Sequence, residues 1–443
     1  MMEITLVALI ISSVIGLLCG ITFGMLPGLG VSSSFLLITP ILVAFHPVYG
    51  LFLFVSFLIT SQYFGSITAL IYGVPGEITS FPVIAERKHL LPMLHNVLFQ
   101  TAVGSLLASL AAMAMFVILM SLNNVWLYLY NYRVFAWILA LAVVGTVCFG
   151  SSTNTIWHNI ILFALGMVLA KIGFNSGTGQ VWGTFGWSGL ASGVDLSALA
   201  LGLLIIPNLV QPFIIAKSDS QDASNSTVRV YWFSMARGTV MGIIGGLVPG
   251  VTYLASTQLS YFVENFLNRK AADRPIKSVV ASSSADNAGS VSSLYPLLCV
   301  GIPISLGEAM VVWLFDRHNL PLSWTTLTQT VQGVPLHWLL LACAVGVNLV
   351  AYSLSWPGRS MAIALARNLL TKTTRYVTII LMVIGTILLS HQAPSAETFW
   401  LCLISSLVVA LRFKQCDWMP LVMAFILYDS IELTLLKLGI LSI

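Results

Sequence analysis

Residues 4–30 read ITLVALIISSVIGLLCGITFGMLPGLG, and they open a stretch without Asp, Glu, Lys or Arg that continues to residue 76. About 20 apolar residues cross the hydrocarbon core of a bilayer as one helix, so this stretch has room for about three crossings. Further charge-free stretches follow at residues 89–132, 134–170 and 196–216. Because helices satisfy their own backbone hydrogen bonds in lipid, the sequence predicts an all-α polytopic membrane protein with about 10 to 12 transmembrane helices.

The composition of the 443-residue chain excludes several classes of protein. Hydrophobic residues make up 58% and charged residues 8%, whereas soluble domains carry about 25% charged residues. A water-soluble globule, a disordered chain and a nucleic-acid binder are therefore excluded. A membrane β-barrel is disfavoured because runs such as residues 111–120 do not alternate between apolar and polar side chains. The cysteines and histidines are scattered, so no metal site is predicted.

Two strings recur in the same order along the chain. The string G-x3-G-x2-P-G begins at Gly20 and again at Gly242, and LIYGVP at residues 70–75 resembles LCVGIP at 298–303. Two ordered matches separated by nearly the same length of chain favour an internal duplication over chance. The polar segment 217–231 separates the copies, so we expect a first repeat at residues 1–216 and a second at 232–443.

The loop charges indicate how the two copies are oriented. The loop near His46 has no Lys or Arg, whereas its counterpart in the second copy carries Arg269, Lys270, Arg274 and Lys277. Lys and Arg favour cytoplasmic loops. Opposite charge at equivalent loops is typical of inverted repeats, which are common in secondary transporters.

Proline and glycine interrupt the apolar segments at four matched places. Pro-Gly breaks the helical hydrogen-bond ladder, and a broken helix is tolerated in a membrane only inside protein or around a watery cavity. There, freed N–H groups can bind an anion and freed carbonyls a cation. A kink or a tight helix contact is the alternative for any single break. The predicted substrate-binding residues lie at these breaks and at nearby polar clusters: Pro27, Gly28, Gly30, Ser32, Tyr63, Gly65, Ser66, Pro75, Gly76, Pro249, Gly250, Thr252, Asp286, Asn287, Ala288, Gly301 and Pro303.

Three acidic residues near the breaks are candidates for coupling transport to H⁺ or Na⁺. Asp286 carries the only formal charge between Lys277 and Glu308, while Glu77 directly follows Pro75-Gly76. Acids inside a membrane are costly and are usually functional. The alternative is a solvated interfacial loop for Asp286 and a helix-end acid at the membrane surface for Glu77 and Glu308.

Several strings along the chain resemble one family. They are GITFGMLPGLG at 20–30, SQYFGSITA at 61–69 and GVPGE at 73–77 in the first half, and GGLVPG at 245–250, ADNA at 285–288 and PLLCVGIP at 296–303 in the second. In this order they resemble the TctA family, the large permease subunit of tripartite tricarboxylate transporters. Residues 282–287 read SSSADN where that family usually has PEAANN, so the scaffold is matched more closely than the ligand site.

The resemblance implies a multi-pass permease of the bacterial inner membrane. Such permeases take up small organic anions of the carboxylate type by alternating access, together with a small membrane subunit and a periplasmic solute-binding protein. The family uses an ion gradient, and the chain accordingly has no GxxxxGK[ST] phosphate-binding loop. Citrate is disfavoured as the substrate because a polyanion requires cationic partners that the predicted site lacks.

Two other functions remain open from the residues alone. The same broken helices could form the filter of an ion or solute channel, and the altered motifs fit an accessory membrane subunit that does not transport. An enzyme is not predicted, because the sequence has neither GxSxG nor HExxH and no convincing pair of acids inside an apolar segment. No cofactor is expected besides the coupling ion.

Overall fold

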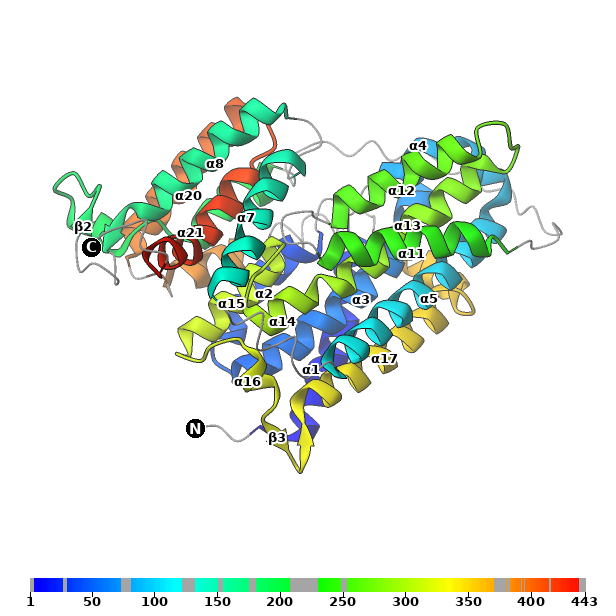
Figure 1. Ribbon diagram of the computed structural model, residues 1–443, viewed down its shortest axis with the longest axis horizontal. Helices are drawn as coiled ribbons and strands as arrows, with labels where there is room; N and C mark the ends of the chain where they lie inside the picture. Colours follow the sequence, from blue (N-terminus) through cyan, green and yellow to red (C-terminus); the bar gives the residue numbers. More distant parts are fainter. Residues whose placement is uncertain are drawn as a thin grey trace.

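The computed structural model describes most of the chain. The described residues are 4–26, 30–72, 81–121, 132–149, 154–174, 181–207, 230–247, 253–369, 383–391, 395–413 and 416–437, together with Ile380 and Ala393. Within them nearly every element is a helix (Figure 1).

The helices of the first half are α1 (Leu6–Gly24), α2 (Val31–Leu42), α3 (Pro47–Tyr72), α4 (Phe81–Leu90), α5 (Leu94–Ser121), α7 (Tyr132–Phe149), α8 (Ile156–Lys171) and α9 (Leu196–Ala200). Shorter turns of helix are η2 (Leu91–Met93), η3 (Ser188–Ser192) and η4 (Leu201–Ile205). Strand β1 (Gly173–Phe174) pairs antiparallel with β2 (Val181–Trp182), with Gly173 opposite Trp182.

The helices of the second half are α11 (Trp232–Leu247), α12 (Tyr253–Leu267), α13 (Arg274–Ser292), α14 (Leu294–Val300), α15 (Leu306–Arg317), α16 (Trp324–Leu327), α17 (Leu336–Ser355), α18 (Arg359–Leu369), α20 (Ala396–Arg412) and α21 (Met419–Lys437). Strands β3 (Thr330–Val331) and β4 (Val334–Pro335) form a second small hairpin, with Val331 opposite Val334.

Hydroxyl side chains begin several of these helices. Thr5 accepts a hydrogen bond from the Ala8 N–H at the start of α1, and Thr155 accepts one from the His158 N–H at the start of α8. A side-chain oxygen at this position satisfies one of the backbone donors that a helix leaves unpaired at its first turn. The apolar runs that follow then form helices because each backbone group finds its partner within the segment.

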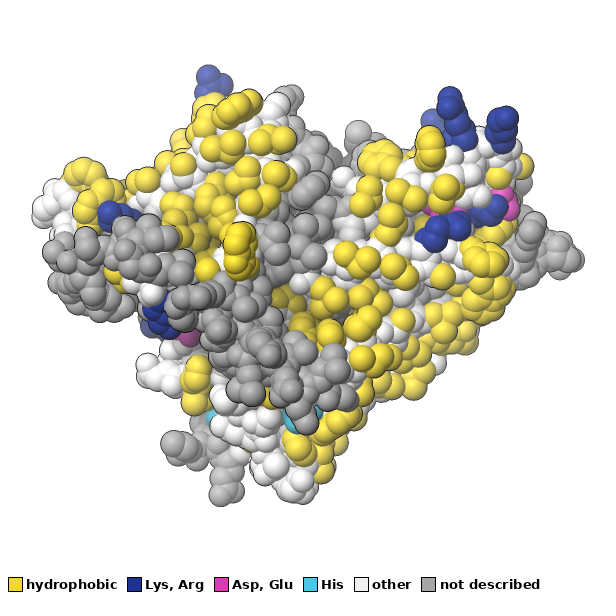
Figure 2. Space-filling view, in the orientation of Figure 1, with side chains coloured by type: hydrophobic (Ala, Val, Ile, Leu, Met, Phe, Trp, Pro, Cys, Tyr) yellow, Lys and Arg dark blue, Asp and Glu magenta, His cyan; other side chains and the backbone are white. Residues whose placement is uncertain are grey.

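The surface of the protein is suited to lipid. Four helices of the described part are long and apolar enough to cross a membrane, at Leu6–Gly24, Pro47–Ile71, Glu86–Met120 and Leu336–Ser355. Figure 2 shows hydrophobic side chains over much of the visible face, with Lys and Arg gathered mainly near its upper right end. The predicted class, an all-α polytopic membrane protein, is confirmed. The total of about 10 to 12 crossings stays a prediction.

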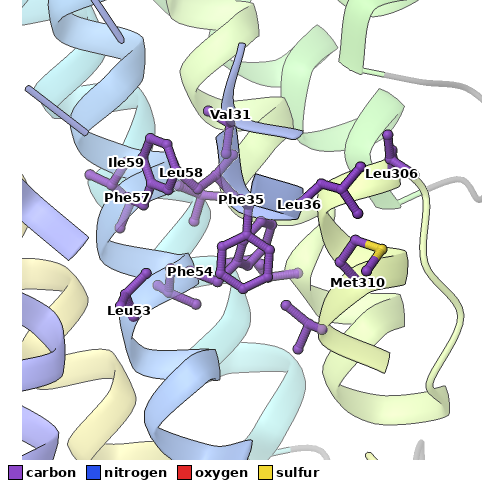
Figure 3. Packing of buried hydrophobic residues seen from close by; sticks show 14 of the residues in the cluster. Val31, Phe35, Leu36, Leu53, Phe54, Phe57, Leu58, Ile59, Leu306 and Met310 are labelled. Atoms are coloured by element: carbon purple, nitrogen blue, oxygen red, sulfur yellow. The ribbon is translucent and has the colours of Figure 1, made fainter. Parts of the chain in front are cut away.

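The central core forms where α2, α3 and α15 meet. Figure 3 shows Phe35 of α2 beside Phe54 of α3, and their ring centroids are 4.8 Å apart at an edge-on angle of 64°. Met310 of α15 lies on the other side of α2 and is fully buried. This packing joins a helix of the second half to the core of the first.

Glycines allow α1 to pack closely against α3. Gly16, Gly20 and Gly24 recur every fourth residue and so lie on one face of α1. A methyl group on Gly16 would collide with the carbonyl oxygen of Leu53, and one on Gly24 would lie 2.8 Å from Cα of Ser61. Small residues of this kind are what permit close contacts between membrane helices.

The same arrangement recurs between α11 and α13. Gly238, Gly242 and Gly246 have the spacing of the α1 glycines, and Gly242 begins the second copy of the string that Gly20 begins. Methyl groups on them would collide with the carbonyl oxygens of Ala281, Ala285 and Gly289 on α13. These three residues have the same spacing along α13 as Leu53, Phe57 and Ser61 have along α3. The helix pairs α1–α3 and α11–α13 are therefore equivalent in both sequence and packing.

A third matched string, beyond the two described above, links α5 to α17. Leu94-His95 recurs as Leu336-His337, and Ala102-Val103-Gly104 recurs as Ala344-Val345-Gly346 at the same spacing. Helix α5 packs against α13 of the other half, and α17 packs against α3. In each half, this helix therefore packs against the other half.

The peripheral helices are exchanged in the same reciprocal way. Helix α8 packs on α21, with Gly166 against Leu421, while α20 packs on η4, with Gly202 against Leu403. These helices form the upper left part of Figure 1, together with α7. The described parts of the two halves are thus related by an approximate twofold arrangement. Most of the predicted linker lies outside the described residues, so the domain boundaries stay predictions.

Candidate functional site

Three of the four predicted breaks fall on residues that the structure does not describe. The predicted site residues outside the described part are Pro27, Gly28, Pro75, Gly76, Glu77, Pro249, Gly250 and Thr252. Helices α1, α3 and α11 end at Gly24, Tyr72 and Leu247, shortly before these breaks. Gly30 precedes α2 as its cap with extended backbone, and the side chain of Ser32 lies outside the described part.

The fourth break, at Pro303, is described in full. Helix α14 ends at Val300, and Gly301 follows with φ of 70°, a left-handed conformation that glycine adopts at helix ends without a steric penalty. Its N–H donates to the Leu297 carbonyl over 3.0 Å. The chain then continues through Ile302 and Pro303 and re-enters a helix at Leu306. The predicted interruption of the helix is present here.

The carboxylate of Glu308 accepts hydrogen bonds from the residues of this break. The Ser293 hydroxyl donates to its Oε1 over 2.7 Å, while the N–H groups of Ile304 and Ser305 donate to its Oε2. The Ser305 hydroxyl in turn accepts from the Glu308 N–H, which completes a reciprocal cap at the start of α15. Glu308 is a helix-end acid, as the alternative stated, and its side chain is buried inside the protein.

A small polar cavity lies between α3, α5 and the end of α17. Its volume of about 10 Å³ is room for about one water molecule. The polar residues that line it are Tyr63, Ser66, Thr101, Ser105 and Ser355, with Ile67, Leu98 and Ala102 between them. None of these described lining residues carries a formal charge. Two predicted site residues, Tyr63 and Ser66, therefore face a common space.

The hydroxyls of this cavity donate hydrogen bonds to protein atoms. Ser66 donates to the Gln62 carbonyl over 2.9 Å, and Thr101 donates to the Val97 carbonyl over 2.9 Å. Each of these carbonyls lies one helical turn earlier in the same helix. Such back-bonds are weak local alternatives, so the hydroxyls can rotate toward a ligand at small cost.

Tyr63 also connects the cavity to α17. Its hydroxyl donates to Asn348 Oδ1 over 2.6 Å, and both side chains are buried. The amide nitrogen of Asn348 donates to the Leu106 carbonyl of α5 over 3.4 Å. Leu106 and Asn348 are themselves equivalent, because each stands two residues after the last glycine of the string that α5 and α17 share. The two copies therefore touch at matching positions.

Ser105 joins the cavity to the predicted cluster on α13. Asn287 Nδ2 donates to Ser105 Oγ over 2.8 Å and to the Ser283 carbonyl over 3.0 Å, and the Ser105 and Ser283 hydroxyl oxygens are 3.4 Å apart. Asn287 Oδ1 has no hydrogen-bond partner within the described part of the chain. Tyr63, Ser66 and Asn287 were predicted from separate motifs, and Ser105 brings them into one connected site.

The remaining predicted residues lie around this site. Asp286 and Ala288 are buried within α13, so Asp286 does not lie in a solvated interfacial loop. Gly65 lies near the end of α1, where a methyl group on it would approach the Gly24 carbonyl oxygen at 3.4 Å.

Sequence reasoning missed four residues of this site: Thr101, Ser105, Asn348 and Ser355. They belong to no motif. For Asn348 there was a signal, because an amide within the apolar run 336–355 is costly unless it has a partner in the bundle. Thr101, Ser105 and Ser355 gave no such signal in the sequence, since serine and threonine occur on many membrane helices for packing alone.

The fold and this site define a class: a polytopic helical membrane protein of two related halves, with a small hydroxyl-lined cavity among its crossing helices. The family described as "Tripartite tricarboxylate transporter TctA family" matches residues 10–423. The chain therefore belongs to the TctA family, and the resemblance is confirmed. Membership makes it a membrane permease of the tripartite tricarboxylate transporter type, a family of transporters and not a class of enzymes.

One curated relative resembles the chain over most of its length. A protein of Agrobacterium vitis, described as "Uncharacterized 52.8 kDa protein in TAR-I ttuC' 3'region", is 26% identical over 453 residues, which cover 97% of this chain and 86% of that protein. No solved structure matches the chain. The TctA family works with a periplasmic binding protein and a small membrane subunit, and it carries organic anions.

Proposed function

We propose that this chain is the permease that moves a small organic anion of the carboxylate type across the bacterial inner membrane. It works by alternating access, driven by a gradient of H⁺ or Na⁺, and receives its substrate from a periplasmic solute-binding protein with the help of a small membrane subunit. One observation carries the proposal: a cavity lined by five hydroxyl side chains lies where α3 and α5 of the first half meet α17 of the second.

The reciprocal packing of the halves supports alternating access. In transporters built from repeats, substrate sites lie at the repeat interface, and one repeat rocks against the other. Here α5 packs on α13 and α17 packs on α3, so relative motion of the halves changes the walls of the cavity. A cavity of about 10 Å³ is too small for a carboxylate. We therefore assign the structure to a closed state that widens when the halves move.

The lining of the cavity favours an anion of low charge. Hydroxyl donors such as Ser66 and Thr101 can hold a carboxylate, whereas none of the described lining residues is Lys or Arg. A tricarboxylate is best held by cationic, bidentate partners. A mono- or dicarboxylate fits this site better than citrate.

The α13 cluster is the best place for the coupling ion. Asp286 and Asn287 are buried there, and Asn287 Oδ1 has no partner among the described residues. Acidic residues buried within membrane proteins commonly mark ion pathways. Glu308 is less suited, because both of its carboxylate oxygens already accept hydrogen bonds from the break at Pro303.

Uptake by the reconstituted three-component system tests the proposal. We expect labelled carboxylate to accumulate in proteoliposomes only when an H⁺ or Na⁺ gradient is imposed, and an Asn287→Leu variant to lose accumulation. A variant of an exposed residue on the apolar face of α1, Val14→Leu, serves as the matched control. Uptake that persists without any gradient and does not saturate would instead identify a channel.

A further inference from the structure

We infer that the end of the molecule formed by α4, α11, α12 and α13 faces the cytoplasm, and that Arg269 and Lys270 hold the headgroups of anionic lipids there. This surface is separate from the polar cavity and does not depend on which anion is carried. The inference starts from the charged side chains, which the fold gathers from both halves at one end of the molecule (Figure 2).

The ends of α4 and α12 and the starts of α11 and α13 meet at this end, which we call the basic end. The hydroxyl of Tyr261 on α12 donates to Glu86 of α4 over 2.9 Å, and Arg274 of α13 lies 3.7 Å from the same carboxylate. The basic end carries the following cations: Arg87, Lys88, Arg237, Arg269, Lys270, Arg274 and Lys277.

Pairing with acids leaves part of this positive charge over. Three acids of the basic end each lie 2.7 to 3.7 Å from a cation of the same end: Glu264 from Arg237, Glu86 from Arg274 and Asp273 from Lys277. Arg269 and Lys270 are exposed in the turn after α12, and no acid of the described part forms an ion pair with them. Their charge is therefore available to a partner outside the chain.

An exposed apolar stripe on α12 leads to these two residues. Leu259, Phe262 and Phe266 are 54%, 61% and 77% exposed, and their spacing places them on one face of the helix. Arg269 and Lys270 continue the same spacing just beyond the end of α12. Lipid acyl chains pack against such a stripe, and cations at its end reach the lipid phosphates. A lipid with an anionic headgroup is thus complementary to both parts of this surface.

Helix α5 shares the direction of α13. The hydroxyl oxygens of Ser105 and Ser283 are 3.4 Å apart, and further along both helices Phe116 packs against Tyr295, just after the end of α13. Contacts that advance together along two helices show that the helices run parallel. Both α5 and α13 therefore lead away from the basic end.

Helix α17 runs in the opposite direction. Asn348 donates to the Leu106 carbonyl of α5, whereas Trp356, at the end of α17, packs against Phe99, nearer the start of α5. The start of α17, with the β3–β4 hairpin before it, therefore lies at the end of the molecule opposite the basic end (Figure 1).

Helix α3 starts at the same end as α17. Tyr63 donates to Asn348, and three residues later Ser66 faces the same cavity as Ser355, so the two helices run parallel. The register of the glycine contacts matches His46, just before α3, with Arg274 at the start of α13. Equivalent helix starts thus lie at opposite ends, as inverted repeats require.

This second end carries little charge. The Thr5 N–H donates to the Tyr49 hydroxyl over 3.1 Å, so α1 starts there beside α3. Among the described residues of 4–50 and 312–336, the only formal charges are those of Asp316 and Arg317. Lys and Arg favour the cytoplasmic side of membrane proteins. The basic end is therefore cytoplasmic, and the β3–β4 hairpin is periplasmic.

Labelling of cysteine from each side of the membrane tests the orientation. In a background whose native cysteines are replaced by alanine, Lys270→Cys and Thr330→Cys place one exposed thiol at each end. We expect a membrane-impermeant thiol reagent to label only Thr330→Cys in spheroplasts and only Lys270→Cys in inside-out vesicles. The reverse pattern, or labelling of both thiols from one side, would overturn the inference.

Trypsin gives the same test on the wild-type chain, without any substitution. We expect cleavage after Arg269 or Lys270 in inside-out vesicles and none at these residues in spheroplasts, with the fragments identified by mass. Cleavage at these residues in spheroplasts contradicts the orientation, even if the cysteine-free background does not fold.

Thermal unfolding in detergent tests the lipid contact. Phosphatidylglycerol or phosphatidylcholine is added to the wild type, to the double variant Arg269→Gln/Lys270→Gln, and to Arg317→Gln as a matched control at the other end. We expect phosphatidylglycerol to raise the Tm of the wild type and of the control more than phosphatidylcholine does. The double variant should need about thirtyfold more phosphatidylglycerol for the same rise, because it lacks two cations at the headgroups.

The remaining outcomes decide whether the partner is a lipid. Equal effects of the two lipids on the wild type, or an unchanged response of the double variant, would overturn the lipid contact. Glycerol phosphate that raises the Tm as much as phosphatidylglycerol would show a site for soluble phosphate instead, and would overturn it too. None of these measurements involves uptake, so their results are independent of the test of the proposed function.

Discussion

At the scale of single residues, the contact between Tyr63 and Asn348 joins the polar cavity to the partner half. The hydrogen bond is 2.6 Å long and fully buried. A buried acceptor that loses its donor still carries its full desolvation penalty, because no hydrogen bond compensates for it. The pair therefore fixes the position of the Tyr63 ring at the cavity wall and stabilises the junction of α3 with α17.

Removing the Tyr63 hydroxyl should destabilise the protein measurably. We expect Tyr63→Phe to lower the free energy of unfolding by about 1–3 kcal/mol, because Asn348 Oδ1 loses its donor in a buried site. Asn348→Leu introduces the residue type of the equivalent Leu106. This substitution should lower the free energy of unfolding less in the Tyr63→Phe variant than in the wild type. Thermal unfolding in detergent measures this cycle, and additive costs would show that the bond contributes nothing.

The sequence predicted only some of these contacts, for a physical reason. Tyr63, Ser66 and Asn287 stand in recognisable strings, whereas Ser105 and Asn348 are isolated polar residues on apolar helices. Which face of an apolar helix turns inward depends on its neighbours, and helix pairing leaves no local pattern when every face is apolar. The polar residues of α5 and α17 could be assigned only once their partners were known.

At the scale of elements, glycine faces decide which helices approach closely. The contacts of Gly242 with Ala285 on α13 and of Gly20 with Phe57 on α3 are equivalent. By contrast, a methyl group on Gly346 of α17 would have nothing within 4 Å. Closely packed interiors cannot absorb an added methyl group without moving backbone.

Alanine substitutions at Gly242 and Gly346 should therefore have different effects. We expect Gly242→Ala to destabilise the protein by about 1–3 kcal/mol, because the new methyl group collides with the Ala285 carbonyl. Gly346→Ala should be neutral, or should stabilise by up to about 1 kcal/mol through helix propensity. Thermal melts of both purified variants measure the difference, and similar melting temperatures would contradict the glycine-face packing.

The break at Pro303 was predicted, and a helix-end role for its acid was one of the two alternatives stated. Proline and glycine interrupt a helix through their own backbone chemistry, so the end of α14 at Val300 follows from the sequence. The role of Glu308 depends on where its carboxylate points. The string Ser305-Leu306-Gly307-Glu308 has the spacing of a capping box, which favours the helix-end alternative over coupling.

At the scale of the whole molecule, duplication was predictable and the exchange of helices was not. The copies that begin at Gly20 and Gly242 revealed the repeats, but the copies that begin at Leu94 and Leu336 lie further apart, because loops between the helices differ in length. Insertions in loops are tolerated and shift the register of later elements. That α5 packs with the second half and α17 with the first is a long-range property that no local pattern encodes.

Exchange of helices predicts that neither half folds alone. We expect residues 1–216 expressed alone to be degraded or to aggregate, because the face of α5 that packs on α13 would be left exposed. Residues 1–216 and 217–443 expressed together should co-purify as one complex with a single melting transition. Size-exclusion chromatography measures this result, and a stable, monodisperse first half by itself would contradict the reciprocal packing.

The bond from Asn348 to the Leu106 carbonyl has a consequence for how such a molecule moves. Where equivalent points of two related bodies touch, rotation of one body about the other displaces those points least. In the alternating-access motion proposed above, this contact would serve as the pivot, and displacement would grow with distance from it. The cavity beside Tyr63 lies at the junction of α3, α5 and α17, so this motion changes its walls.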